Sequence, residues 1–161
     1  MLTNPRYEIT PTTRTILIDT DDQVDQDDYG ASKALTLGDG VRPVSGEILS
    51  AVFFSWEEGS GAVQTPAGTL LLLSADPAES AGDTAITAAE RVTVLGHVAV
   101  AAADWQSDAN GASAFIYDQP VPFHNLQTLY AVWFHEDATG LNDNAADDEF
   151  LAVQLWYRRD T

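Results

Sequence analysis

The stretch FLAVQLWY, Phe150 to Tyr157, decides the fold class of this chain. Its apolar residues recur at every second position: Leu151, Val153, Leu155 and Tyr157. That spacing places them on one face of a β-strand, whereas a helix needs apolar residues three to four apart. Trp156 falls on the opposite face, so the stretch predicts a strand with one face on a core and an aromatic residue on the other.

Similar short apolar segments recur earlier along the chain. They cover residues 14–19 (RTILID), 47–56 (EILSAVFFSW), 69–74 (TLLLLS), 91–100, 112–117 (ASAFIY) and 129–135 (LYAVWFH). Turn signals separate them, among them the Asn110-Gly111 pair, which tolerates the positive φ angles of tight hairpins. We expect an all-β fold: a single, jelly-roll-like β-sandwich of about eight to ten short antiparallel strands. Residues 83–90 are the one candidate for a helix, so little helix is predicted.

The length of 161 residues fits one domain. We expect residues 1–28 to form an N-terminal arm and acidic loop, and residues 29–161 to form the sandwich. There is no apolar run long enough to cross a bilayer, and the first residues lack the pattern of a signal peptide. The protein is therefore expected to be made in the cytoplasm and to work there or inside an assembly built there. Cysteine is absent, which excludes disulfides and thiolate chemistry.

The charge is strongly one-sided, with 25 acidic against 7 basic residues and a net charge of −18. Lys33 is the only lysine. A field of this sign repels nucleic acid and anionic membranes, so neither is expected as a partner. Salt screens such self-repulsion. The composition therefore suits a marine or halophilic setting, with an ordinary acidic surface as the alternative.

No nucleophile elbow, phosphate-binding loop, dinucleotide fingerprint or zinc-protease motif occurs, so we expect no enzyme. His97, His124 and His135 are far apart in sequence and lack the clustered spacing of a metal site. Adjacent carboxylates such as Glu57-Glu58 point to opposite faces of a strand, so they do not supply the geometry of a glycosidase. No cofactor is therefore predicted, apart from a structural cation.

Calcium or another divalent cation is the possible exception, because residues 19–28 and 142–149 are dense in oxygen ligands. Neither segment has the EF-hand glycine. The candidate ligands are Asp19, Asp21, Asp22, Asp143, Asp147 and Asp148. The alternative is that both segments are solvated acidic loops.

Five residues are candidates for subunit contacts: Trp56, Trp133, Trp156, Arg158 and Arg159. Tryptophan is enriched at protein interfaces, although it more often fills the second face of a central strand. The tryptophans could also form a stacking platform for sugars. The two arginines end the last apolar segment of an acidic chain, where they anchor either a neighbouring subunit or a local carboxylate.

Four segments carry a resemblance to a known class of proteins: LLLLSADPAESAGDT, VAVAAADWQSDANGASAFIYDQPVPFH, LYAVWFHEDATGLND and FLAVQLWYRRD. Between Gly46 and Asp160 the chain resembles small jelly-roll head proteins of tailed viruses, meaning capsid decoration, cement or turret proteins. The resemblance implies a non-enzymatic virion protein on the capsid surface. Its expected partners are the major capsid protein and copies of itself, in a homo-oligomer.

Several alternatives remain open at this point. One is a carbohydrate-binding or host-attachment β-sandwich module, which predicts an exposed aromatic strip. Another is a tail or baseplate subunit of similar fold. An acidic mimic of DNA and a small cupin-type metal enzyme rank last. The acids cluster in loops instead of following one face, and the histidine spacing is wrong for a cupin.

Overall fold

The computed structural model describes residues 8–19, 22–58, 62–78, 81, 83, 85–142 and 148–160. Two short helices occur in this part of the chain, α1 (Ala88–Arg91) and the 3-10 turn η1 (Ala102–Asp104). The strands are β1 (Glu8–Pro11), β2 (Thr15–Ile18), β3 (Lys33–Thr36), β4 (Val44–Glu57), β5 (Gly68–Leu73), β6 (Val94–Val100), β7 (Trp105–Ser107), β8 (Ala112–Leu126), β9 (Thr128–His135) and β10 (Glu149–Arg159). The predicted all-β class, with little helix, is confirmed.

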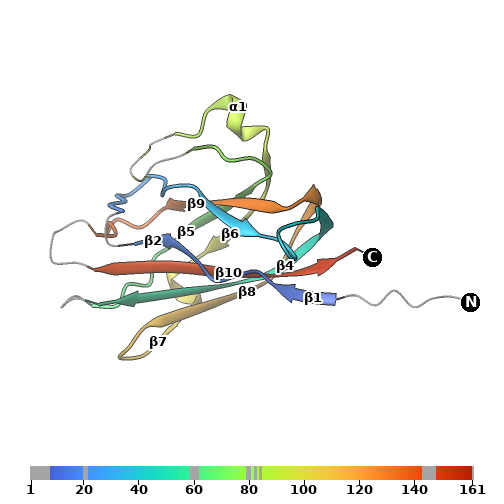
Figure 1. Ribbon diagram of the computed structural model, residues 1–161. Helices are drawn as coiled ribbons and strands as arrows, with labels where there is room; N and C mark the ends of the chain where they lie inside the picture. Colours follow the sequence, from blue (N-terminus) through green and yellow to red (C-terminus); the bar gives the residue numbers. More distant parts are fainter. Residues whose placement is uncertain are drawn as a thin grey trace, which may run out of the picture.

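The strands form two antiparallel sheets that face each other (Figure 1). The six-stranded sheet has the order β1-β10-β4-β8-β7, with β2 also paired to β10, and the four-stranded sheet has the order β3-β9-β5-β6. Four pairs nest within one another along the chain: β2 with β10, β3 with β9, β4 with β8, and β5 with β6. This nesting of a long wrapped hairpin over two sheets is the jelly-roll arrangement.

Alternation along the strands decides which side chains enter the core. On β10, Leu151, Val153 and Leu155 are fully buried between the sheets, as their spacing predicted. Trp133 on β9 enters the same core and packs against Phe53 of β4, with ring centroids 5.8 Å apart. The core therefore consists of the inward-facing positions of both sheets.

A second, smaller apolar cluster lies on the outer side of the four-stranded sheet. Val132 and Leu73 face outward there, and the chain covers them with Tyr29 and Ile86. Ile86 directly precedes the capping box of α1, in which Thr87 Oγ1 accepts a hydrogen bond from the backbone N–H of Glu90. The segment between β5 and β6, with α1 in it, thus caps this face (Figure 1).

The N-terminal boundary expected after residue 28 does not separate an arm from the sandwich. Both β1 and β2 pair with the same edge of β10, β1 with its C-terminal end and β2 with its N-terminal half. Thr12, between them, also joins the sheet, because its backbone N–H donates to the carbonyl of Leu155. Residues 8–18 therefore belong to the six-stranded sheet, while residues 1–7 lie outside the described part of the chain.

The segment 91–100 also differs from its predicted strand. The strand begins only at Val94, and its pairing with β5 shifts register between Leu72 and Leu73. Alternation would place Val92, Val94, Val98 and Val100 on one face. Val98 and Val100 do face the core, but Val94 packs on the outer cluster and Val92 is 84% exposed. A single shift in register moves every residue beyond it to the other face.

Asp76 links the covering segment of the outer cluster to the loop before β3. One oxygen of Asp76, Oδ1, accepts hydrogen bonds from Ser32 Oγ at 2.7 Å and from the backbone N–H of Ala78 at 2.8 Å. The Ser32 hydrogen bond, followed by the one from Ala78, lowers the pKa of the Asp76 carboxyl below its ordinary value. The ionised Asp76 carboxylate therefore adds to the free energy of unfolding at neutral pH, and this contribution is lost as the pH falls through the lowered pKa of Asp76.

We predict that Ser32→Ala raises the pKa of Asp76 toward that of a free aspartate, because the largest cause of its lowering is removed. An NMR titration of the carboxyl carbons measures this shift. Asp39 is the internal control, since backbone hydrogen bonds from Val41 and Arg42 lower its pKa and Ser32 takes no part in them. An unchanged Asp76 titration in the variant would contradict the prediction.

Candidate functional site

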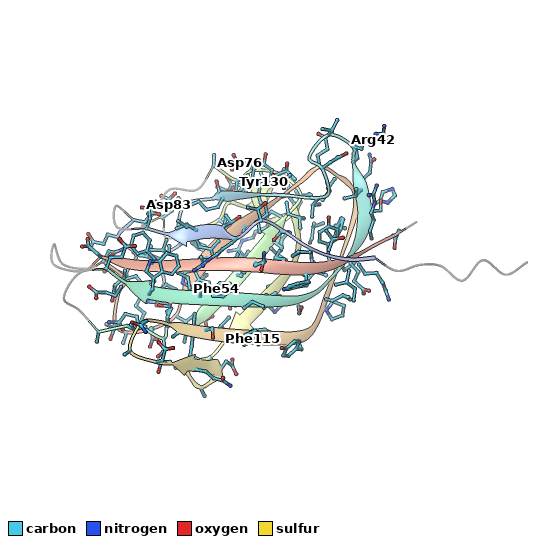
Figure 2. The ribbon with its side chains drawn as sticks, turned by 60° about the horizontal axis from the view of Figure 1, so that its bottom comes forward. Arg42, Phe54, Asp76, Asp83, Phe115 and Tyr130 are labelled. Carbon is cyan, nitrogen blue, oxygen red and sulfur yellow. The ribbon has the colours of Figure 1, made fainter. Side chains whose placement is uncertain are left out.

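The outer face of the six-stranded sheet is the most distinctive surface of the molecule. Seven large apolar side chains are exposed among the described residues, and five of them lie on this face: Ile9, Ile16, Phe115, Tyr117 and Trp156. Figure 2 looks toward it, with Phe54 and Phe115 labelled on the strands. We call this surface the outer aromatic face. Unlike the outer side of the four-stranded sheet, it is not capped by the segment carrying α1.

The outer aromatic face is poor in acid although the chain is rich in it. The central strands β4, β8 and β10 present a single carboxylate outward, considering only the side chains that the structure describes. It is Glu47, and Arg158 neutralises it through an ion pair of 2.6 Å. Two copies of a protein with 25 acidic residues repel each other over most of their surface, but the described outward side chains of β4, β8 and β10 contribute only the neutralised Glu47.

At one end of the face a groove of about 750 Å³ opens between β2, β4 and the β7–β8 hairpin. We call it the Arg14 groove. The guanidinium of Arg14 lies over the rings of Phe54 and Trp56, 4.3 and 4.7 Å from their centroids. The other residues that line the groove are Ile16, Ser55, Gln106, Asp108, Asn110, Gly111, Ala112 and Ser113.

The walls of the Arg14 groove are held in place by local contacts. Trp56 stacks on Phe150 of the neighbouring strand, with centroids 4.9 Å apart and planes 3° from parallel. The hairpin wall is fixed by Asp108 Oδ1, which accepts hydrogen bonds from the backbone N–H groups of Asn110 and Gly111. The predicted turn at residues 108–111 therefore forms and lines the groove, although neither Asn110 nor Gly111 adopts the positive φ angle on which the prediction rested.

A second hollow, of about 570 Å³, lies farther along the same face. It is lined by Ile9, Leu49, Ser50, Tyr117, Pro120 and Trp156. Tyr117 is 65% exposed and Trp156 is 36% exposed, so large aromatic surface is open to water here. We call it the Trp156 hollow, and together with the Arg14 groove it gives the outer aromatic face two depressions.

The structure separates the predicted interface candidates. Trp56 and Trp156 lie on the outer aromatic face, whereas Trp133 is fully buried in the core and presents no surface to a partner. This corrects the expectation for Trp133, whose position on β9 points inward. Arg158 pairs with Glu47 of its own chain, and Arg159 is exposed at the end of β10.

Among their described residues, the two acidic segments come together around Asn142. The side-chain amide of Asn142 donates to the backbone carbonyl of Asp19 at 2.7 Å, which joins the two segments. Asp22 pairs with the ammonium of Lys33 at 3.3 Å. Asp148 is exposed. The described residues contain no group of three ligands suited to a metal ion. The other candidate ligands lie outside the described residues: Asp21, Asp143 and Asp147.

The three histidines lie on different strands. His97 is exposed on β6 and His124 is exposed on β8, where its Nδ1 lies 3.0 Å from Ser45 Oγ. His135 is buried on β9, and its Nε2 lies 2.8 Å from the carbonyl oxygen of Thr139. The fold therefore leaves the histidines in three separate environments.

No protein-family model matches the chain, and no curated protein matches its sequence. In the part of the chain that the structure describes, no helix is long and apolar enough to cross a membrane.

Sequence reasoning did not single out Arg14, Phe54, Phe115 or Tyr117 as members of a site. The sequence did contain a pattern for the aromatic residues. Phe54 with Trp56 and Phe115 with Tyr117 are each two residues apart on a strand, so the members of each pair share a face. Nothing in the sequence placed Arg14 beside either pair.

Proposed function

We propose that this protein is a structural subunit of a virus particle, a capsid decoration or accessory head protein that attaches through its outer aromatic face. The observation that carries the proposal is an exposed, aromatic and nearly acid-free sheet face on a chain of net charge −18. Exposed apolar surfaces of this kind mark protein contacts, and interface cores are depleted in charge and enriched in aromatic residues. The resemblance to head proteins of tailed viruses points to the same role.

The two edges of the six-stranded sheet differ. At one edge β1 and β2 have four residues each, whereas at the other edge β7 pairs with only residues 112–114 of the 15-residue β8. Short edge strands such as β1 and β2 offer few unpaired backbone groups to a neighbouring chain. The proposed partners are the major capsid protein and other copies of this chain, and apolar burial drives their association.

The first test of this function is the copy number of the protein in purified particles from its source. Quantitative mass spectrometry should find a fixed, high ratio to the major shell protein that survives gradient purification. A few copies per particle would move the protein to the tail or baseplate. Complete absence from particles would overturn the proposal.

We predict that Tyr117→Glu lowers the number of copies that rebind to stripped particles by at least about tenfold, which corresponds to 1.4 kcal/mol. The new carboxylate would have to be buried against apolar surface without a partner. The measurement is co-sedimentation in 1 M salt, where the Debye length is about 3 Å and general repulsion is screened.

Val92→Glu is the matched control for Tyr117→Glu, because it adds the same charge at an apolar residue that is 84% exposed and lies off the face. It should rebind like the unmodified protein. Equal rebinding of both variants would show that the outer aromatic face is not the contact.

A carbohydrate-binding module is the second candidate, favoured by the aromatic floor and polar rim of the Arg14 groove. Sugars stack on exposed ring faces, but here the guanidinium of Arg14 lies over the rings of Phe54 and Trp56. The groove therefore suits an anionic group that pairs with the Arg14 guanidinium better than it suits a neutral sugar ring.

A further inference from the structure

The surroundings of Arg14 differ from those of the two basic residues that form ion pairs. Lys33 and Arg158 each form an ion pair with a carboxylate. No carboxylate among the described residues lies within 4.0 Å of the Arg14 guanidinium, which rests on two aromatic rings instead. Asp108 lines the same groove, but its Oδ1 accepts hydrogen bonds from the backbone of its own turn and it forms no ion pair with Arg14.

Two aromatic rings lie beneath the guanidinium, whose carbon is 4.3 and 4.7 Å from their centroids. Stacking of arginine on aromatic rings uses the flat faces of the guanidinium and leaves its N–H groups at the edge. A planar guanidinium that is already ordered pairs with a carboxylate through two parallel hydrogen bonds, and less side-chain entropy is lost on binding. The Arg14 groove therefore has the form of a carboxylate receptor.

We propose that the Arg14 groove binds an aspartate or glutamate side chain, flanked by apolar residues, from a segment of a partner subunit in the particle. This inference rests on the proposed function and names the chemistry of its contact. The carboxylate would pair with Arg14, and its apolar neighbours would contact Ile16 and Ala112 on the groove walls. The side-chain amides of Gln106 and Asn110 stand at the rim for the polar backbone of the segment.

Charge favours a protein segment over other anions. A net charge of −18 repels free anions and polyanions such as nucleic acid, so a lone ionic contact with Arg14 is opposed by the rest of the molecule. A peptide carboxylate brings apolar surface with it, and burial of that surface adds affinity that salt does not screen. The groove offers both kinds of contact within one depression.

The first experiment uses a blocked tripeptide with glutamate between two leucines, and the same tripeptide with glutamine. Binding to the full chain is followed through the backbone amide NMR signals of Asn110 and Gly111, which line the groove. We expect the glutamate peptide to bind at least about tenfold more tightly, a difference of 1.4 kcal/mol. Arg14→Gln should reduce this preference to about one, and Arg14→Lys should retain only part of it because the ammonium lacks the planar fork.

Arg42→Gln is the matched control, since it removes the same charge from an exposed arginine away from the groove (Figure 2). It should preserve the preference for glutamate. Equal binding of the two peptides to the unmodified protein, or a preference that survives Arg14→Gln, would overturn the inference. Tighter binding of glucuronate than of the glutamate peptide would assign the groove to sugar acids. Self-association that Arg14→Gln abolishes would assign it to a second copy.

Rebinding to stripped particles separates this inference from the proposed function. If both hold, Arg14→Gln and Tyr117→Glu each release the protein from particles, and Arg42→Gln does not. Release by Tyr117→Glu alone would retain the outer aromatic face as the contact and overturn carboxylate recognition. Full rebinding of both variants would overturn the proposed contact face as well.

Discussion

Trp133→Ala is expected to lower the free energy of unfolding by about 3–5 kcal/mol, the typical loss for a buried tryptophan. The side chain is fully buried between the sheets, packs on Phe53 and donates its Nε1–H to His135 Nδ1 at 3.3 Å. Gly68 shows how tightly the site is packed, because a Cβ there would lie 2.4 Å from the Trp133 ring. A cavity at this place cannot close without moving both sheets. Since small domains are stable by only about 5–15 kcal/mol, the variant should be close to unfolding.

Urea denaturation followed by circular dichroism measures this loss, and Trp156→Ala is the matched control. Trp156 lies on the outer aromatic face and is 36% exposed, so its removal should cost less than about 1 kcal/mol. Trp133→Phe separates two effects, because it keeps most of the ring volume and removes the donor to His135. Equal losses for Trp133→Ala and Trp156→Ala would contradict the assignment of one to the core and the other to the surface.

Asn142→Ala should destabilise the protein by about 2–4 kcal/mol, because the loss of several buried hydrogen bonds adds to backbone strain. Asn142 is 8% exposed and has a φ of +53°. Its Oδ1 accepts the backbone N–H of Glu149, and its amide donates to the carbonyls of Glu149 and Asp19. Removal of the side chain leaves these buried groups without partners and loosens the join between the two acidic segments.

Asn125→Ala is the matched control for the cost of placing alanine at a positive φ, since Asn125 is exposed and has a similar φ of +54°. Its backbone N–H donates to Ser45 Oγ, a contact that the substitution retains. This variant should therefore lose about 1 kcal/mol from left-handed strain alone. The difference in the free energy of unfolding between the two alanine variants, obtained from thermal melts, measures how much the hydrogen bonds of the Asn142 side chain stabilise the protein. No difference would show that the network contributes nothing.

Most of the fold could be predicted from the sequence because alternation is a local property. The inward positions of β10 follow from FLAVQLWY alone, and the turn at residues 108–111 follows from its Asp and Asn-Gly residues. β1 and β3 were not predicted. Each has four residues of mixed polarity, EITP and KALT, whereas the equally short β2 carries the apolar run TILI. β1 and β3 are instead held by long partners, β10 and β9.

The sequence by itself determined the composition of the sheet faces, and the tertiary structure decided which of them meets water. Phe54 with Trp56 and Val132 with Phe134 both follow the rule that residues two apart share a face, and both pairs turn away from the core. Tyr29 and Ile86 pack against the second pair from distant parts of the chain. The first pair receives Arg14 and opens into the groove. Alternation acts within one strand, whereas burial of an outward face depends on segments brought there by the wrapping of the whole chain.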